Sequence, residues 1–97
     1  MTHRNPRLLS LARDQACVAC GVNDGTVVAA HSNLGEHGKG MGLKAHDGMS
    51  AWLCHQCHHQ LDQGARMSKA ERRLFTLESI CLTYMQLWSQ GLIEVKT

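Results

Sequence analysis

The sequence predicts a small α+β domain whose core is completed by a bound metal. Two observations favour this class: short strand-like runs that end beside histidine- and cysteine-rich segments, and one long helical pattern near the C-terminus. The 97 residues predict one domain, 1–97, because chains of this length rarely support two cores. Aromatic residues make up only 4% of the chain, and small cores with few large side chains often need a metal or covalent staple.

The N-terminal half predicts one helix and two strands around a long loop. Residues 1–16 contain the segment PRLLSLARDQA, which predicts a short helix with its leucines directed inward. Residues 26–31, TVVAAH, predict a strand that ends at His31, and residues 49–54, MSAWLC, predict a second strand. The intervening residues 32–48 are rich in glycine but match no nucleotide-binding glycine motif, so we expect a flexible loop that approaches a partner.

The C-terminal half predicts two helices. Residues 57–63 have a helical pattern with Gly64 as a left-handed cap, and an S-x-x-E capping box begins a second helix at about 68–90. The tail LIEV is a candidate edge strand. Cys81 is predicted to be a small core residue because it belongs to the apolar positions at helical spacing. These positions are Leu74, Leu77, Cys81, Tyr84 or Met85, and Trp88.

Four of the five cysteines form two C-x-x-C pairs, CVAC and CHQC, which predict a structural zinc site. A pair at this spacing places both sulfurs on one turn at roughly 2.3 Å from a tetrahedral zinc, and two pairs close the coordination sphere. The ligands are Cys17, Cys20, Cys54 and Cys57. A redox function would need one such pair in a βαβ context, which the pattern lacks. The odd cysteine count and the lack of a signal-like or long apolar segment favour an intracellular, cytoplasmic protein with no membrane segment.

The cysteines leave three histidines and an aspartate near them unexplained, namely His55, His58, His59 and Asp62. His58 and Asp62 are four residues apart on the predicted helix, so both project from one face and could bind a divalent cation together. The alternative is a surface histidine–aspartate pair without a metal. The sequence thus predicts two metals, one structural and one catalytic.

The net charge of +2 does not by itself indicate a nucleic-acid-binding protein. The basic residues nevertheless gather before the first cysteine pair, in the glycine-rich loop and after the second pair. We expect some of them to contact phosphates, with a solvated surface charge as the alternative for each. The phosphate-binding candidates are Lys39, Lys44, Arg66, Arg72 and Arg73.

The segments AAHSN, the glycine-rich loop and LCHQCHHQLD resemble the HNH, or ββα-metal, nuclease fold in its cysteine-knuckle form. They are similar in particular to small phage and prophage HNH proteins related to RecA-dependent nucleases. The resemblance covers about residues 17–64 and implies a ββα-metal core followed by a C-terminal helix. It implies that His31 activates water, and that His58 and Asp62 bind the catalytic Mg²⁺ or Mn²⁺.

The chain departs from the HNH pattern at two positions. Ala30 stands where many members have a metal ligand, so the cation would depend more on water and substrate phosphate, which Mg²⁺ tolerates. Met49 stands where the middle asparagine is expected. Asp47 is the first candidate to orient His31 in its place, and Asn33 is a weaker one.

The resemblance implies a phage- or prophage-encoded, metal-dependent endonuclease that hydrolyses DNA phosphodiester bonds. A recombination or replication protein is a candidate partner by family analogy alone. The alternative is a noncatalytic zinc module that binds nucleic acid or a partner protein. The two functions differ in what they require of His31, because a binding module needs no histidine that faces the helical metal pair.

Overall fold

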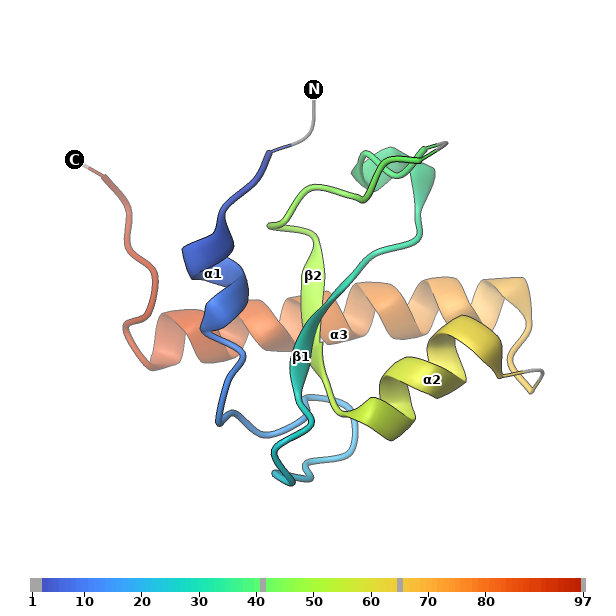
Figure 1. The fold of residues 1–97 in the computed structure, drawn as a ribbon, viewed down its shortest axis with the longest axis horizontal. Helices are drawn as coiled ribbons and strands as arrows, with labels where there is room; N and C mark the ends of the chain where they lie inside the picture. Colours follow the sequence, from blue (N-terminus) through green and yellow to red (C-terminus); the bar gives the residue numbers. More distant parts are fainter. Residues whose placement is uncertain (1–2, 41, 65, 97) are drawn as a thin grey trace.

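The computed structural model describes residues 3–40, 42–64 and 66–96. Two antiparallel strands lie across the long C-terminal helix, with a short α-helix on either side of them (Figure 1). The elements are α1 (Pro6–Ser10), β1 (Val28–His31), the 3₁₀ helix η1 (Gly35–His37), β2 (Ser50–Leu53), α2 (His55–Gln63) and α3 (Lys69–Ser89). This arrangement confirms the α+β class. In the described part of the chain, no helix is long and apolar enough to cross a membrane.

The sheet is small, and its second strand lies at the centre of the molecule. Val28 pairs with Leu53 and His31 pairs with Ser50, so the predicted strand end at His31 is also the observed one. All four residues of β2 are buried, because β1 lies along one edge of this strand and α3 packs against it. A strand buried on both faces reads as a continuous run of buried side chains, as SAWL does.

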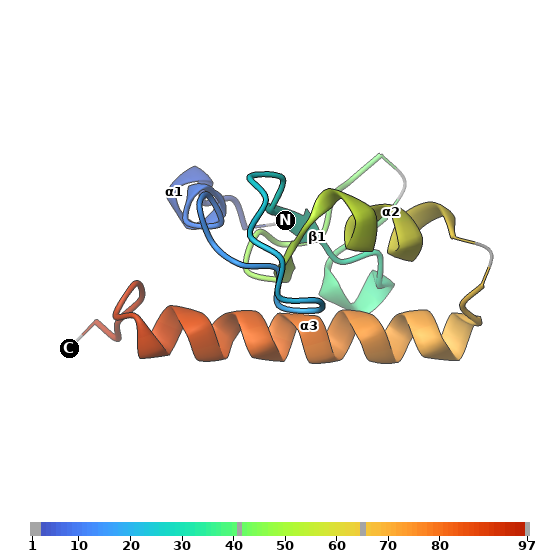
Figure 2. The same cartoon turned by 90° about the horizontal axis from the view of Figure 1, so that it is seen from below.

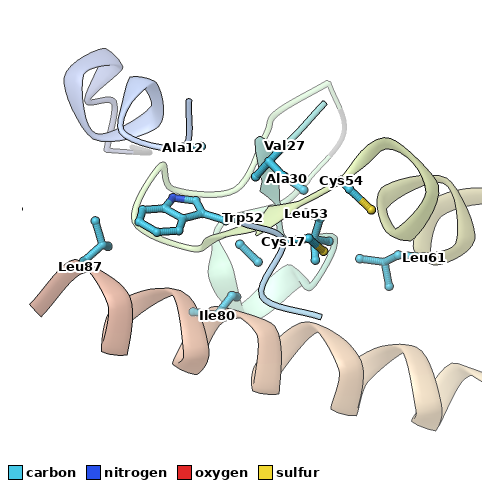
Figure 3. Close-up of a cluster of buried hydrophobic side chains, with 11 residues drawn as sticks. Ala12, Cys17, Val27, Ala30, Trp52, Leu53, Cys54, Leu61, Ile80 and Leu87 are labelled. Carbon is cyan, nitrogen blue, oxygen red and sulfur yellow. The ribbon is translucent and has the colours of Figure 1, made fainter. Parts of the chain in front are cut away.

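The hydrophobic core lies between β2, α3 and the cysteine-bearing turns (Figure 3). Trp52 and Leu53 of β2 are almost fully buried and belong to one cluster with Ile80 and Leu87 of α3. Cys17 and Cys54 belong to the same cluster. The cysteine site is therefore continuous with the core, as expected for a staple in a chain that has few large apolar side chains.

Helix α3 begins at the predicted capping box, in which Ser68 N–H donates to Glu71 Oε1 (3.0 Å) and Glu71 N–H donates to Ser68 Oγ (3.1 Å). The predicted buried stripe of this helix, however, is wrong: Cys81 is exposed, as are Leu74, Met85 and Trp88. The residues that face the core are Thr76, Ser79, Ile80, Thr83 and Leu87.

The reason for this difference is a close approach between α3 and the β2 backbone. Trp52 N–H donates to Thr83 Oγ1 (3.0 Å), and the Thr83 hydroxyl in turn donates to Ser79 O (2.8 Å). Small hydroxyl side chains can be buried where their hydrogen bonds are satisfied, and their size lets the strand approach the helix. A prediction from hydrophobic periodicity counts serine and threonine as polar residues. It therefore predicts a buried stripe on a different face of α3 from the one that packs against β2.

Two smaller predictions are also wrong. Gly64 has a φ of −70° and is not a left-handed cap; its N–H bonds to Gln60 O instead. In the described tail, residues 92–95 form no strand, although Leu92 and Ile93 pack against the core. The glycine-rich loop has hydrogen bonds at several described positions: Ser32 N–H donates to Met49 O (2.9 Å), and His46 N–H donates to His37 O (2.9 Å). Its flexibility and its approach to a partner stay predictions.

Candidate metal and histidine site

The four cysteines of the two C-x-x-C pairs converge on one point. Their Sγ atoms all lie within 4.8 Å of one another, and those of Cys20 and Cys54 are 3.7 Å apart. A tetrahedral zinc with bonds of about 2.3 Å requires sulfurs roughly 3.8 Å apart, whereas a disulfide would bring two sulfurs to about 2.05 Å. All five cysteines are free of disulfides. The donor set therefore fits a structural zinc ion, as the sequence predicted.

The backbone around each pair is folded to present the sulfurs. In the first knuckle, Cys17 N–H donates to Val22 O and Gly21 N–H donates to Cys17 O, both at 2.8 Å. Gly21 has a φ of +82°, a left-handed conformation that glycine adopts without strain. In the second knuckle, Cys54 is the N-cap of α2, and its Sγ accepts a hydrogen bond from Cys57 N–H (3.5 Å). The sulfur thus helps to define where α2 begins.

The protein alone does not favour four thiolates at this point. Burial, followed by hydrogen bonds with the neighbouring cysteines, raises the pKa of the Cys57 thiol. Burial acts in the same direction at Cys17, but hydrogen bonds from the surrounding backbone, first of all at Cys54, outweigh it and lower that pKa to about 7. The Cys17 thiolate therefore forms readily, whereas the Cys57 thiolate needs the charge of a cation, which is typical of zinc sites.

His31 is held by a buried carboxylate. Its Nε2 lies 2.8 Å from Asp47 Oδ1, and the two side chains are 19% and 3% exposed. Asp47 lies in the segment that leads into β2, and its backbone carbonyl accepts a hydrogen bond from the Ser50 hydroxyl (2.8 Å). Ser50 is the residue of β2 that pairs with His31 in the sheet. The structure thus brings Asp47 to the histidine that it was expected to orient.

The remaining partners of this carboxylate come from the N-terminus. Arg4 donates to Asp47 Oδ1 (3.1 Å) and to the carbonyls of Ala45 (2.6 Å) and Lys44 (2.9 Å), and Asn5 N–H donates to Asp47 Oδ2 (2.6 Å). In the sequence, Arg4 is only one of several basic residues that precede the first cysteine pair. No local signal could reveal its role, because its partners lie about forty positions away in the chain.

The charge state of Asp47 follows from these contacts. Burial alone would raise the pKa of this carboxyl. Hydrogen bonds from His31, Asn5 and Arg4 outweigh burial and lower the pKa of Asp47 to about 2. Asp47 is therefore an anion at neutral pH, and a neutral His31 must place its proton on Nε2 to bond with it. The lone pair of that imidazole is then on Nδ1, which makes no hydrogen bond to any described residue.

His58 and Asp62 lie together on α2, one turn apart. His58 Nε2 is 3.0 Å from Asp62 Oδ2, and both side chains are a little over one-third exposed. Asn33 Nδ2 donates to Asp62 Oδ1 (3.0 Å), so the weaker candidate for orienting His31 contacts the helical pair instead. Asn33 is two residues beyond the end of β1, and this hydrogen bond joins the segment after His31 to α2. Within the described residues, only the cysteines form a set of three or more candidate metal ligands.

The basic residues proposed to contact phosphates fall into two groups. Arg72 donates to Leu61 O (3.1 Å) and to Gly64 O, so it closes the C-terminal end of α2, and Arg73 pairs with Glu36 (2.8 Å). These two side chains therefore have structural partners that the sequence did not reveal. The other candidates, Lys39, Lys44 and Arg66, are exposed.

Comparison with known proteins identifies one family. A family model described as "Putative nuclease YbcO" matches residues 7–92. The matched region contains both C-x-x-C pairs, His31, Asp47 and the whole of α2 and α3. No curated protein and no solved structure matches the chain significantly.

Proposed function

The chain belongs to the YbcO nuclease family, and we propose that it is an HNH-type, metal-dependent endonuclease that hydrolyses DNA phosphodiester bonds. The observation that carries this proposal is the contact between His31 and the buried, ionised Asp47. A structural zinc module needs no such pair, because the pair contributes nothing to the cysteine site. A general base, in contrast, needs a partner that fixes its orientation and tautomer.

His31 would act through its free nitrogen. With Nε2 donating to Asp47, the Nδ1 lone pair can accept a proton from a water molecule that attacks phosphorus. The imidazolium that forms is stabilised by the anionic carboxylate, which itself stays ionised because of its low pKa. Arg4 and the Asn5 amide hold that carboxylate in place, so the orientation of the base is fixed by three separate hydrogen bonds.

The His58–Asp62 pair fits a divalent cation. An octahedral Mg²⁺ with bonds of about 2.0–2.1 Å needs adjacent ligands roughly 3.0 Å apart, and His58 Nε2 is 3.0 Å from Asp62 Oδ2. When bound, the cation would stabilise the negative charge on the phosphate and the leaving oxygen. Asn33 donates to the other carboxylate oxygen and so orients Asp62. Two protein ligands suffice for Mg²⁺ or Mn²⁺, because these ions usually keep several waters.

The DNA backbone would be held by the exposed lysines and arginine. Lys39 and Lys44 belong to the loop that leads from η1 towards Asp47, and Arg66 lies between α2 and α3. These side chains would give affinity that is salt-dependent and largely independent of sequence. Arg72 and Arg73 would contribute through the fold instead, because their guanidinium groups already have protein partners.

A matched pair of histidine variants tests this proposal. Plasmid nicking by the zinc-loaded protein is measured with Mg²⁺ or Mn²⁺ for the wild type, His31→Ala and His55→Ala, the last being an exposed histidine on α2. We expect His31→Ala to lose roughly 100-fold or more in rate and His55→Ala to resemble the wild type. Nicking by His31→Ala at the wild-type rate would show that His31 is not the base.

The second candidate function is a noncatalytic zinc module that binds nucleic acid. It is favoured by one observation, namely that the His58–Asp62 pair offers only two protein ligands in the described part of the chain. This function predicts a mobility shift of DNA by the wild-type protein without nicking under any divalent cation. Nicking that depends on His31 would exclude it.

A further inference from the structure

Helix α3 carries an apolar face that no described element covers. Figure 2 shows every other element on one side of α3, while the opposite side faces outward. At 100° per residue, five apolar residues lie on the outward side, and we call them the outer stripe. They are Leu74, Leu77, Cys81, Met85 and Trp88. Leu74, Met85 and Trp88 are 57%, 61% and 52% exposed. A helix on a surface normally has a polar outward face, so this stripe indicates an interaction surface.

We propose that the outer stripe binds the outer stripe of a second copy of this chain, in an antiparallel two-fold dimer centred on Cys81. In such a dimer, each residue faces the partner residue at the same distance on the other side of position 81. Leu74 then faces the partner's Trp88, and Leu77 faces the partner's Met85. Cys81 lies next to the partner's Cys81 on the two-fold axis. The apolar positions are thus arranged symmetrically about one residue, as a self-complementary interface requires.

The charges on α3 favour this antiparallel orientation over a parallel one. A parallel pair would bring the two basic N-terminal ends of α3 together. The antiparallel pair separates these basic ends. It also sets the positive N-terminus of each helix dipole near the negative C-terminus of the other.

The shape and area of the face suit a reversible dimer. Leu77, Glu78, Cys81 and Leu82 line an open hollow of about 320 Å³, opposite the position that the partner's Met85 would take. The exposed fractions of the stripe correspond to an apolar surface on the order of 400 Å² per copy, about half of the area that one partner buries in a standard interface. Flanking polar side chains would supply the rest, so we expect a dissociation constant on the order of micromolar.

The proposal is independent of the nuclease assignment. His31 and His58 belong to β1 and α2, which lie on the other side of α3 from the outer stripe (Figure 2). The dimer would therefore leave both histidines accessible. A failure of the dimer would not affect the nuclease proposal, and an inactive nuclease could still dimerise.

The oligomeric state of the full, zinc-loaded chain tests the proposal. Sedimentation equilibrium is measured for the wild type, for Met85→Glu in the stripe, and for Val95→Glu as a control at an exposed apolar residue of the tail. We expect a dimer for the wild type and Val95→Glu, and a dissociation constant at least about 10-fold higher for Met85→Glu. A wild-type chain that stays monomeric at millimolar concentration, or a dimer that Met85→Glu leaves unchanged, would overturn the proposal.

A charge-pair experiment tests the register. Leu74→Glu and Trp88→Lys should each weaken the dimer, whereas the double variant should restore it, because each new glutamate faces the partner's new lysine. The two positions are fourteen residues apart on one helix, so the two new charges cannot compensate each other within one chain.

A short bis-maleimide should also link two wild-type chains through Cys81, and Cys81→Ser should abolish the link. A double variant no stronger than the singles, or a link elsewhere, would refute the antiparallel register.

Discussion

The contact between Asp47 and His31 leads to a prediction for Asp47→Asn. The substitution keeps the shape of the side chain but removes its charge and one acceptor oxygen. Three donors converge on this group in the structure: the His31 ring, the Arg4 guanidinium and the Asn5 amide. An amide nitrogen is itself a donor. At the Oδ2 position it would meet the Asn5 N–H, and at the Oδ1 position it would meet Arg4 and favour the wrong tautomer of the His31 imidazole.

The expected loss of stability can be worked from the pKa of Asp47. The ordinary carboxyl pKa of 3.8 falls to about 2 in the folded protein, a difference that corresponds to about 2 kcal/mol. The side chain is 3% exposed, so solvent screens these contacts little. A lowered pKa means that the stabilisation is complete above pH 4 and is lost as the pH falls towards 2. We therefore expect Asp47→Asn to lose about 2 kcal/mol of unfolding free energy at neutral pH.

Urea unfolding in excess zinc measures this loss through the fluorescence of the tryptophans, of which Trp52 is 2% exposed. Asp24→Asn is the matched control, because Asp24 is an exposed carboxylate whose Oδ1 accepts hydrogen bonds from Thr26 that an amide oxygen can also accept.

Plasmid nicking by Asp47→Asn should fall by roughly 100-fold or more. A loss below about 0.5 kcal/mol would refute the hydrogen-bond argument. Wild-type nicking by a destabilised Asp47→Asn would show that the carboxylate is structural only.

Three further predictions concern the metals and the N-terminal segment. Cys20→Ser should reduce the zinc content from one ion per chain and unfold the protein, whereas Cys81→Ser should keep the zinc, as measured by elemental analysis and circular dichroism. His58→Ala should weaken Mn²⁺ binding at least about 10-fold in paramagnetic resonance titrations, and His59→Ala, which alters an exposed neighbour, should not. Arg4→Gln should cost about 1 kcal/mol in urea unfolding, less than Asp47→Asn, because the Arg4 side chain is 41% exposed.

The zinc site and the strand positions could be read from the sequence because their signals are local. Two C-x-x-C pairs specify the zinc ligands by spacing alone, and a strand that ends in histidine is visible as a β-branched run. The contact between His58 and Asp62 also follows from local geometry, since residues four apart on a helix are neighbours. These features needed no knowledge of how distant segments meet.

The features that the sequence did not reveal depend on distant contacts. Arg4 and Asp47 are 43 positions apart, and only the folded chain shows that they meet. The orientation of α3 was mispredicted because Thr83 and Ser79 are polar by type but are buried through hydrogen bonds with β2 and with each other. A large leucine or tryptophan at those positions would keep the strand from approaching the helix.

The zinc site also determines where the histidine–aspartate pair of α2 lies. Cys54 caps this helix and Cys57 lies in its first turn, so the zinc ligands fix the helix start from which His58 and Asp62 follow at one-turn intervals. The first knuckle is joined to β2 through the bond from Val18 N–H to Trp52 O (3.0 Å), and β2 in turn holds the strand that ends at His31. A metal held by the four cysteines would thereby set both halves of the proposed active site, because neither a nine-residue helix nor a two-stranded sheet is stable alone in water.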